Sequence, residues 1–375
     1  MVRLDELCII NMGQSPDSST YNEDGNGLPF FQGNADFGAT YPVVRMWCSE
    51  PTKRAQIDDI LISVRAPIGA LNIANCECCI GRGLAALTVN KNSCIQKYLW
   101  YALSNKVEEL NSKGTGSTFK AINKKILAET EIPLPSLDEQ RKIAAVLDKV
   151  SDLIAKRRQQ LDKLDELIKA RFVEMFGTLS RPSQKFKYDI LKNLCRKITD
   201  GKHGGCTPQL GSGRYFVGAR EIFDDSVHNE TAPEIAIDEF EKDYKRCNLE
   251  IGDLLIVNTG ATIGKSAIAC DFRTQHTLLQ KSVALLKVKS ELINPVFLKY
   301  CYRVNETMYK VESASAQPNL LLSKINTTSI YVPPMALQNQ FAAFVEQTEK
   351  TKTTISESLE KLETLKKALM QEYFG

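Results

Sequence analysis

Apolar residues recur every three or four positions over a long stretch in the middle of the chain, a spacing that places them on one face of a helix. The members of this stripe are Leu147, Val150, Ile154, Leu161, Leu164, Ile168 and Met175. Ser136 and Glu139 form a capping-box pattern at its start, and Pro133 and Pro135 keep a helix from beginning earlier. The pattern predicts a helix over residues 136–177, about 60 Å long at 1.5 Å per residue.

The same segment returns at the end of the chain. "LDKLDELIKARFVEMFG", from Leu161, and "LEKLETLKKALMQEYFG", from Leu359, share nine identical residues. Upstream, "IPLPSLDEQ" from Ile132 returns as "VPPMALQNQ" from Val332, and both copies end in Gln. The copies lie about 200 residues apart, so the chain is an internal repeat. The second copy has Asn339 in place of Glu and lacks the Ser, which predicts a less firmly fixed helix start.

A narrow apolar stripe on so long a helix favours packing against one partner helix. The obvious partner of each long helix is its own repeat, and the two would pair as an intramolecular coiled coil. In the alternative, each helix packs only on its own globular domain. We favour pairing because about 40 residues is far longer than the average helix of a globular domain.

The remaining sequence combines short apolar runs, such as "GLAALTV" and "SVALLKV", with amphipathic helical patches, such as "IQKYLWYALSNKVEEL". Glycine, asparagine and threonine separate the runs, which is typical of a compact α+β domain. We therefore expect an α+β fold with two globular domains of mixed α/β structure and two long helices. The predicted segments are a first domain at 1–135, a helix and linker at 136–179, a second domain at 180–333 and a second helix at 334–375.

The stretch "GATIGKS", at residues 260–266, resembles a phosphate-binding loop. Only three residues separate its first Gly from Gly-Lys-Ser, one fewer than a P-loop requires. The following "SAIACDF" is typical of a strand rather than a helix, and the equivalent stretch of the first repeat, "RAPIGALNI", has no lysine at the matching position. We therefore predict a strand–turn–strand element at this position in both repeats.

The bulk composition is that of an ordinary globular protein, with 43% hydrophobic and 25% charged residues and a net charge of +3. With no apolar run long enough to span a membrane and no signal-peptide pattern at the start, we expect a cytoplasmic protein. The eleven cysteines include a cluster at Cys76, Cys78 and Cys79, which we interpret as buried or incidental thiols rather than metal ligands. We find no catalytic motif, and we interpret "PEIAIDEFEKDYK" as a solvated charged loop rather than a nuclease site.

The repeated segments resemble a known family, the specificity subunits of type I restriction–modification systems. The resemblance rests on "IPLPSLDEQRKIAAVLDKV" followed by "LDKLDELIKARFVEMFG", on their second copies, and on the pair "DILISVRAPIG" and "DLLIVNTGATIG". It covers essentially the whole chain. It implies two target-recognition domains, each reading half of a split double-stranded DNA sequence, separated by two antiparallel helices.

The resemblance also implies partners. Methyltransferase subunits, carrying S-adenosylmethionine, would dock on the long helices, and a restriction and translocase subunit, using ATP and Mg²⁺, would join them. This chain would itself be non-catalytic and bind no cofactor or metal. A solitary DNA-binding regulator is an alternative, and a structural or adhesive protein that presents two modules on a coiled coil is another.

DNA recognition requires Arg or Lys on phosphates and Arg, Asn, Gln, Ser or Thr on base edges. Polar, glycine-rich loops of both domains offer such residues, and the loop at 114–120 is similar in kind. The candidate DNA-binding residues are Gln14, Ser15, Gln32, Asn34, Arg65, Arg82, Lys120, Lys202, His203, Arg220, Thr259, Lys265, Gln275 and Lys281.

Overall fold

The computed structural model describes the whole chain apart from residues 117–119 and 311–317. The candidate DNA-contact loop at 114–120 therefore lies partly outside the described residues, whereas its last residue, Lys120, lies within them.

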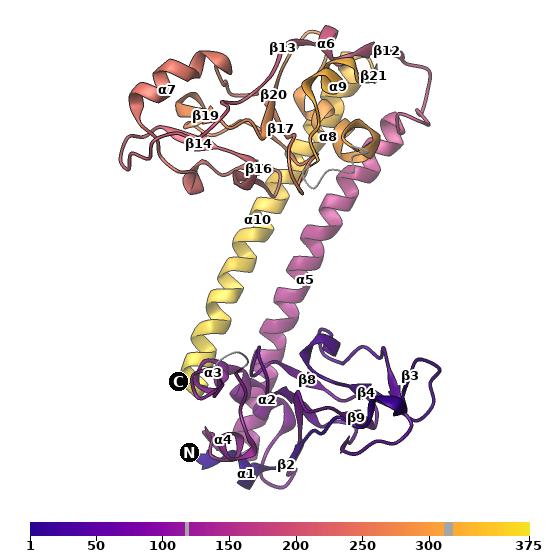
Figure 1. The fold of residues 1–375 in the computed structure, drawn as a ribbon, viewed down its shortest axis with the longest axis vertical. Helices are drawn as coiled ribbons and strands as arrows, with labels where there is room; N and C mark the ends of the chain where they lie inside the picture. The colour runs from indigo at the N-terminus through magenta and orange to yellow at the C-terminus, as the bar shows by residue number, and fades with distance from the viewer. Residues whose placement is uncertain (117–119, 311–317) are drawn as a thin grey trace. The chain divides into compact units, whose positions relative to one another are not determined.

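The chain divides into two compact units (Figure 1). Unit 1 comprises residues 1–158 and 357–375, and unit 2 comprises residues 159–356. The long helices α5 (Leu137–Phe176) and α10 (Met335–Phe374) each contribute to both units. Unit 1 holds the first part of α5 and the last part of α10, and unit 2 holds the remaining part of each.

The centre of the domain in unit 1 is a four-stranded antiparallel sheet. In sheet order its strands are β2 (Cys8–Met12), β10 (Leu84–Val89), β7 (Ile60–Ser63) and β8 (Leu71–Ile73). Successive side chains of a strand point to opposite faces. Ile60 and Ile62 accordingly pack with Tyr98 of helix α2 (Gln96–Asn105), whereas Leu61 packs on the other face with Phe31. The shorter helices of this domain are α1 (Leu4–Leu7), α3 (Val107–Ser112) and α4 (Lys124–Ala128).

A second sheet of five short strands covers that other face. In sheet order it contains β3 (Tyr21–Asn22), β5 (Trp47–Cys48), β4 (Leu28–Phe31), β9 (Cys78–Ile80) and β6 (Arg54–Ala55). Cys78 and Cys79 are buried in β9, and burial raises the pKa of Cys78 to about 12 and that of Cys79 to about 11. These two thiols are interior residues, as predicted. A separate pair, β1 (Val2–Arg3) and β11 (Glu131–Ile132), joins the two ends of the domain.

Unit 2 repeats the central sheet with β13 (Cys195–Asp200), β20 (Val283–Val288), β17 (Leu254–Val257) and β18 (Ser266–Ile268). Ile256 packs with Phe297 of helix α8 (Pro295–Val304), and Leu255 packs on the opposite face with Val217. The flanking strand pairs are β12 (Lys187–Ile190) with β21 (Ser329–Val332), β14 (Tyr215–Val217) with β19 (Thr277–Leu279), and β15 (Ile222–Phe223) with β16 (Ser226–Val227). Two short helices, α6 (Leu191–Leu194) and α9 (Leu322–Thr327), complete the domain.

The segment that resembles a phosphate-binding loop is a strand–turn–strand, as predicted. Strand β17 leads through a turn, in which Lys265 N donates to Thr262 O (3.1 Å), into the antiparallel strand β18. Strands β7 and β8 form the equivalent element of unit 1. Because no helix follows the turn, it lacks the helix N-terminus on which a P-loop depends.

The acidic segment predicted to be a solvated loop is instead helical. Helix α7 (Ile237–Asp243) is followed by a single 3₁₀ turn. Asp238 and Glu239 lie in its first turn, where their negative charges interact favourably with the positive end of the helix dipole. Phe240 is buried, and its ring centroid lies 4.8 Å from that of Tyr244. The loop prediction was wrong because one buried aromatic residue anchors an otherwise charged segment.

In unit 1 the two long helices run antiparallel. Arg158 Nη2 of α5 lies 2.6 Å from Glu363 Oε1 of α10, and Leu147 of α5 shares the hydrophobic core with Phe374 of α10. Contacting residues have higher numbers on α10 where those on α5 are lower, as antiparallel helices require. The ion pair is exposed and contributes little, so the apolar contact carries this part of the packing.

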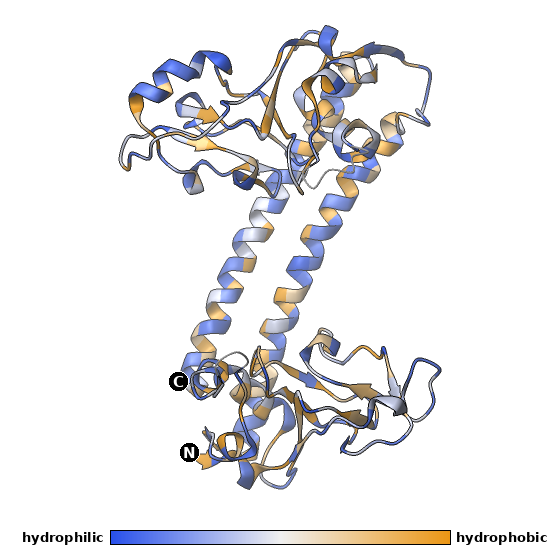
Figure 2. Ribbon diagram, in the orientation of Figure 1, coloured by the Kyte–Doolittle hydropathy of each residue, from blue (hydrophilic) through white to orange (hydrophobic). Residues whose placement is uncertain are grey.

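Unit 2 shows the same antiparallel arrangement. Lys352 Nζ lies 2.8 Å from Asp165 Oδ1, and the Phe341 ring packs edge-on against Phe172 at 5.3 Å. In Figure 2 both helices are largely blue or white, with orange residues interspersed. In the described ranges, no helix combines the length and the apolar run that crossing a bilayer requires.

The long helices start at equivalent residues of the repeat. Helix α5 covers the predicted range to within one residue at each end, and Ser136 Oγ accepts a hydrogen bond from Glu139 N (3.3 Å), as the capping box predicted. Helix α10 begins at Met335, which therefore matches Leu137. This register differs by two residues from the alignment of the proline-rich segments, so Gln140 matches Gln338, and Asn339 matches Arg141 rather than Glu139. Asn339 Oδ1 accepts a hydrogen bond from Asn294 Nδ2 (3.0 Å), so a different side-chain contact lies at the second start.

Candidate nucleic-acid interface

In unit 1, several loops converge on residues 81–83, the central turn between β9 and β10. Gln14 N donates to Ile80 O (3.0 Å) where the chain leaves β2, and Ser15 Oγ accepts from Arg82 N (3.2 Å). Gly81 N donates to Phe31 O (2.9 Å), which brings the loop after β4 to the same place. The predicted residues of three separate loops therefore lie together.

Two further predicted residues reach this turn through the loop after β7. Val64 N donates to Gly83 O (2.9 Å), and Ala66 N donates to Lys120 O (3.1 Å). Arg65 lies between these two bonded residues in the chain, so its backbone is held between the central turn and Lys120. The structure thus gathers six of the seven candidates of the first domain, and Asn34 starts the 3₁₀ turn Asn34–Asp36 that follows the loop after β4. The exposed candidates are Gln14, Gln32, Arg65, Arg82 and Lys120.

A close backbone approach makes this convergence possible. A Cβ at Gly13 would lie 2.8 Å from Leu84 O and closer still to Gly81 O. Real Cβ atoms do not approach backbone oxygens this closely, so only glycine lets β2 end against the central turn. The same holds for Gly201 at the end of β13, whose Cβ would meet Leu279 O and Gln280 O.

Unit 2 repeats this backbone frame around its own central turn, residues 280–282. Lys202 N donates to Leu279 O (2.7 Å), Asn258 N to Ser282 O (3.0 Å) and Gly260 N to Pro318 O (3.1 Å). These bonds match those made at Gln14, Val64 and Ala66 in unit 1. The loop after β14 joins as well, because Ala219 N donates to Ser282 Oγ (3.1 Å), and Arg220 follows it.

The side chains on the shared frame differ between the units. The equivalent positions are Gln14 and Lys202, Ser15 and His203, Arg65 and Thr259, Lys120 and Pro318, and Arg82 and Lys281. Only the last pair keeps its charge, and both of its members are exposed on the central turn. The backbone is common to the two units, and the chemistry it presents is not.

Lys202 is less available than its sequence position suggests. Its Nζ lies 2.8 Å from Asp243 Oδ2 and 2.9 Å from Glu239 Oε2, and its side chain is 19% exposed. These hydrogen bonds, chiefly that to Asp243, raise the pKa of Lys202. Hydrogen bonds from Thr207 and Lys202 lower the pKa of Glu239 to about 2. The three charges form a local network that orders the loop, and direct DNA contact by Lys202 stays a prediction.

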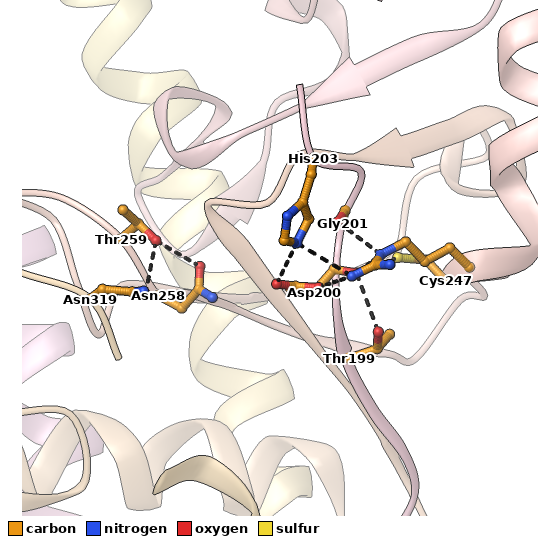
Figure 3. Close-up of polar contacts among 9 residues, drawn as sticks. Thr199, Asp200, Gly201, His203, Cys247, Asn258, Thr259 and Asn319 are labelled. Atoms are coloured by element: carbon orange, nitrogen blue, oxygen red, sulfur yellow. Dashed lines mark hydrogen bonds and ion pairs between the residues drawn. The ribbon is translucent and has the colours of Figure 1, made fainter. Parts of the chain in front are cut away.

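His203 projects from the same loop and is held by a residue that the sequence analysis missed. Figure 3 shows His203 beside Asp200 and Gly201, and His203 Nε2 lies 3.2 Å from Asp200 Oδ2. Arg246 Nε donates to Asp200 O and Gly201 O (both 2.9 Å), and its Nη2 pairs with the Asp200 carboxylate. Arg246 thus fixes both the backbone and the carboxylate beneath the His203 ring. The sequence around Arg246 gives no signal for this role, because Arg246 and Asp200 are 46 residues apart in the chain.

Thr259 lies in the loop after β17, at the position that Arg65 occupies in unit 1. Its Oγ1 donates to Asn319 Oδ1 (3.2 Å), and Asn258, the residue before it, is buried (Figure 3). The side chain is half-buried, so its hydroxyl lies at the edge of the loop cluster.

Two candidates lie elsewhere. Gln275 is on the 3₁₀ turn Thr274–His276 that precedes β19, whereas the central turn follows β19. Lys265 is at the β17–β18 turn and lines a cavity of about 780 Å³ with residues of both long helices. The structure therefore groups Lys202, His203, Arg220, Thr259 and Lys281 but not these two.

The cavity beside Lys265 contains three carboxylates whose oxygens lie within 4.8 Å of one another, those of Asp165, Asp225 and Glu349. Lys352 Nζ lies 2.8 Å from Asp165 Oδ1 and 3.2 Å from Glu349 Oε1. Arg303 pairs with Asp225. The acidic groups are thus neutralised by resident side chains, which makes the cluster a structural network rather than a set of free metal ligands.

Comparison with known proteins defines the class. Residues 1–166 and 207–366 match the family model of the type I restriction modification DNA specificity domain. The chain belongs to this family, which confirms the resemblance noted in the sequence. The two matched stretches correspond to the two repeats.

Individual relatives agree with this class. The putative type I restriction enzyme MjaX specificity subunit of Methanocaldococcus jannaschii is 45% identical over 157 residues, which are 42% of this chain and 37% of that subunit. The MjaIX specificity subunit of the same organism is 26% identical over 313 residues, or 76% of this chain and 70% of that one. The match to the MjaX subunit thus spans little more than a third of its length.

The fold is also similar to a solved structure, that of the S subunit of a type I restriction-modification system from M. genitalium. The TM-score is 0.60 with 16% identity, and the match covers 100% of this chain and 95% of that one. At this identity the likeness concerns the fold, and it supports the predicted class of two mixed α/β domains with long helices.

Proposed function

We propose that each unit reads one half of a bipartite double-stranded DNA sequence through the loops around its central turn. The observation that carries this proposal is the shared backbone frame with different side chains. A frame that is kept while its exposed residues diverge is suited to reading two different sequences in the same manner. Gln, Ser, Asn, Thr and Arg side chains at these positions can pair with base edges in the major groove.

In this proposal Arg82 and Lys281 contact phosphates. They occupy the same exposed position in both units and keep their positive charge while their neighbours change. Phosphate contacts position a protein on the duplex without reading sequence, so this is the one role that both units would share.

We further propose that methyltransferase subunits dock on the long helices. In unit 1, α5 exposes Val146 (40%) and Leu153 (39%), one heptad apart, and in unit 2 it exposes Leu167 (48%) and Val173 (42%). Aliphatic side chains left exposed on one helix in this way can pack against a helix of a partner. These partners would carry S-adenosylmethionine, and a restriction subunit would bring ATP and Mg²⁺. This chain, acting in the cytoplasm, would supply sequence recognition and no catalytic step.

Selection from a pool of random duplexes tests the proposal. The purified chain is mixed with the pool in moderate salt, with and without methyltransferase subunits, and bound DNA is sequenced. We expect the complex to select two fixed half-sequences separated by a gap of fixed length, and the chain alone to bind weakly and with strong salt dependence. Selection of a single uninterrupted sequence, or of none, would contradict bipartite reading.

A module exchange tests whether the halves are independent. We propose that residues 1–135 and 180–333 are the two recognition domains, connected by the helical segments at 136–179 and 334–375. Replacing 1–135 with a homologous domain should change only one half of the methylated sequence, as mapped by sequencing of methylated sites. Changes in both halves in a folded exchange variant would show that the domains do not read independently.

A further inference from the structure

Each long helix has one completely buried glutamine close to its start. Gln140 and Gln338 lie in the first turn of α5 and α10, and each has 0% exposure. The large majority of buried polar side chains are hydrogen-bonded. Their burial is a feature that DNA contacts and partner docking leave unexplained.

Gln140 joins three segments of unit 1. Its Oε1 accepts a hydrogen bond from Ile95 N (2.8 Å), and Ile95 is the N-cap residue of α2. Its Nε2 donates to Ser93 O (3.1 Å), in the loop before α2, and to Pro135 O (2.9 Å), just before α5. One side chain therefore ties the start of the long helix to the start of a domain helix.

Gln338 makes the same three bonds in unit 2. Its Oε1 accepts from Asn294 N (2.8 Å), the N-cap residue of α8, and its Nε2 donates to Leu292 O (3.2 Å) and Pro333 O (2.8 Å). The distances agree with those of unit 1 to within about 0.1 Å, which is ordinary scatter for hydrogen bonds of one kind. Only a primary amide on a side chain of this length accepts one bond and donates two in this arrangement.

Other polar contacts between domain and helix differ between the units. In unit 1, Tyr101 OH donates to Asp148 Oδ1 of α5 (2.7 Å). The equivalent residue of α8 is Tyr300, whose hydroxyl is buried and has no hydrogen-bond partner among the described residues. The glutamine contacts are retained where neighbouring contacts have diverged, so they serve something that both units require.

We propose that Gln140 and Gln338 are positioning residues that fix the direction in which each domain is held on its long helix. The inference rests on the proposed function in one respect: the direction of each domain determines where its loop cluster meets DNA, and so helps to set the gap between half-sequences. Three hydrogen bonds at the point where the helix leaves the domain restrict bending there. Apolar packing contributes most of the stability of the contact between domain and helix, and the amide fixes the orientation of the domain.

The test compares Gln338→Leu with Gln347→Leu. Leucine is close to glutamine in size but lacks all three hydrogen bonds, and Gln347 is an exposed residue of the same helix. Each variant is produced with the methyltransferase subunits, and methylated sites are mapped across a genome. We expect Gln338→Leu to increase, by about tenfold, the share of methylated sites whose gap is one base pair longer or shorter than that of the wild type. The half-sequences should stay unchanged. The reason is that loss of the residues supporting a binding site lets it move by about 1 Å or more.

A merely stabilising role gives a different result. Gln338→Leu would then lower the melting temperature and reduce methylation equally at all gaps, and this outcome would overturn the inference. Gln140→Leu should relax the gap in the same way as Gln338→Leu, and the double variant more than either. Gln347→Leu should keep the wild-type gap.

A second measurement does not depend on DNA reading. Spin labels are attached through ketone-bearing amino acids at Glu241 of α7 and Lys350 of α10, both exposed and both in unit 2. We expect a single narrow distance distribution in the wild type and in Gln347→Leu, and a broader or shifted one in Gln338→Leu. An unchanged distribution in Gln338→Leu would refute the inference. If the wild type directs no bipartite methylation, the proposed function fails, and this distance measurement alone decides the role of the glutamine.

Discussion

Gly201→Ala should destabilise unit 2 and disturb its recognition loops. Gly201 follows the last residue of β13, and an added Cβ would lie well inside 3.0 Å of Leu279 O, Leu279 C and Gln280 O. All three are backbone atoms, so no side chain can rotate away to make room. The end of β13 and the central turn must separate by about 1 Å to restore ordinary contact distances.

The magnitude follows from the strain and from the bonds it weakens. Overpacking of this kind costs about 1–3 kcal/mol. The separation also weakens the bonds from Lys202 N to Leu279 O (2.7 Å) and from Gly201 N to Val283 O (3.2 Å), each of which contributes about 0.5–1.5 kcal/mol. We expect a loss of about 3 kcal/mol in the free energy of unfolding, which corresponds to a fall of about 6–12 °C in the melting temperature of a unit this size.

Gly205→Ala is the matched control from the same loop. A Cβ at Gly205 meets no atom within 4 Å, and its backbone is not left-handed. There the substitution should be neutral, or stabilising by about 0.4–1 kcal/mol because it restricts the unfolded chain. Calorimetry and urea denaturation of both variants give the comparison.

The functional readout is the half-sequence read by unit 2. Because Lys202 and His203 follow Gly201 directly, displacement of the loop should weaken discrimination in that half-sequence and leave the other half unchanged. Equal stability of Gly201→Ala and Gly205→Ala would show that the close backbone approach does not constrain this turn, and the account of the frame would be wrong.

Two further predictions concern charge and packing. Arg82→Ala and Lys281→Ala should each lower the slope of log affinity against log salt by about one, because each removes one phosphate contact. Lys125→Ala, which removes an exposed lysine of helix α4 that is outside both central turns, should not. An unchanged slope in both turn variants would exclude the phosphate role. Phe374→Ala should destabilise unit 1 by about 3–5 kcal/mol although it is the penultimate residue, because its ring is 3% exposed and packs on an aromatic residue of α2. Glu372→Ala, at an exposed position two residues earlier, should leave the calorimetric transition within about 0.5 kcal/mol of the wild type.

The parts of the fold that the sequence predicted are those governed by local periodicity. The stripe on α5 fixes which face is buried, and Leu147 and Ile168 are fully buried as it requires. Comparison of the repeats also separated a strand–turn–strand from a nucleotide-binding loop, because a catalytic lysine cannot be absent from one copy of a shared site. Helix α7 escaped prediction because its one anchoring residue, Phe240, stands alone among charges.

The candidate site was harder to predict, since its geometry depends on which strands pair. Nothing local in the sequence distinguishes Lys202, whose loop joins the central turn, from Lys265 and Gln275, whose loops do not. All three follow polar, glycine- or threonine-containing stretches. Their separation arises from strand pairing and from the parallel alignment of β14 with β19, which joins residues about 60 positions apart.

Arg246 illustrates the same limit from the other side. It lies on a 3₁₀ turn after α7, far along the chain from the loop that it supports. Its guanidinium group contacts both the backbone oxygen and the carboxylate of Asp200. A sequence scan for exposed basic residues would assign it to DNA. In the structure its hydrogen bonds go instead to Asp200 and Gly201, beside the exposed ring of His203.

The repeat itself contained a signal that motif reading did not use. Aligning the starts of the two long helices, Leu137 with Met335, pairs Gln140 with Gln338, and both units bury this residue. Aligning the proline-rich segments by their shared Pro and Leu pairs Gln140 instead with Gln340, which is exposed. Helix capping does not explain it, because the capping Ser and Glu of the first copy are replaced in the second. A polar residue that persists where its capping neighbours change must satisfy a tertiary contact. The amide of Gln140 and Gln338, bonded to the start of a neighbouring helix in each unit, is that contact.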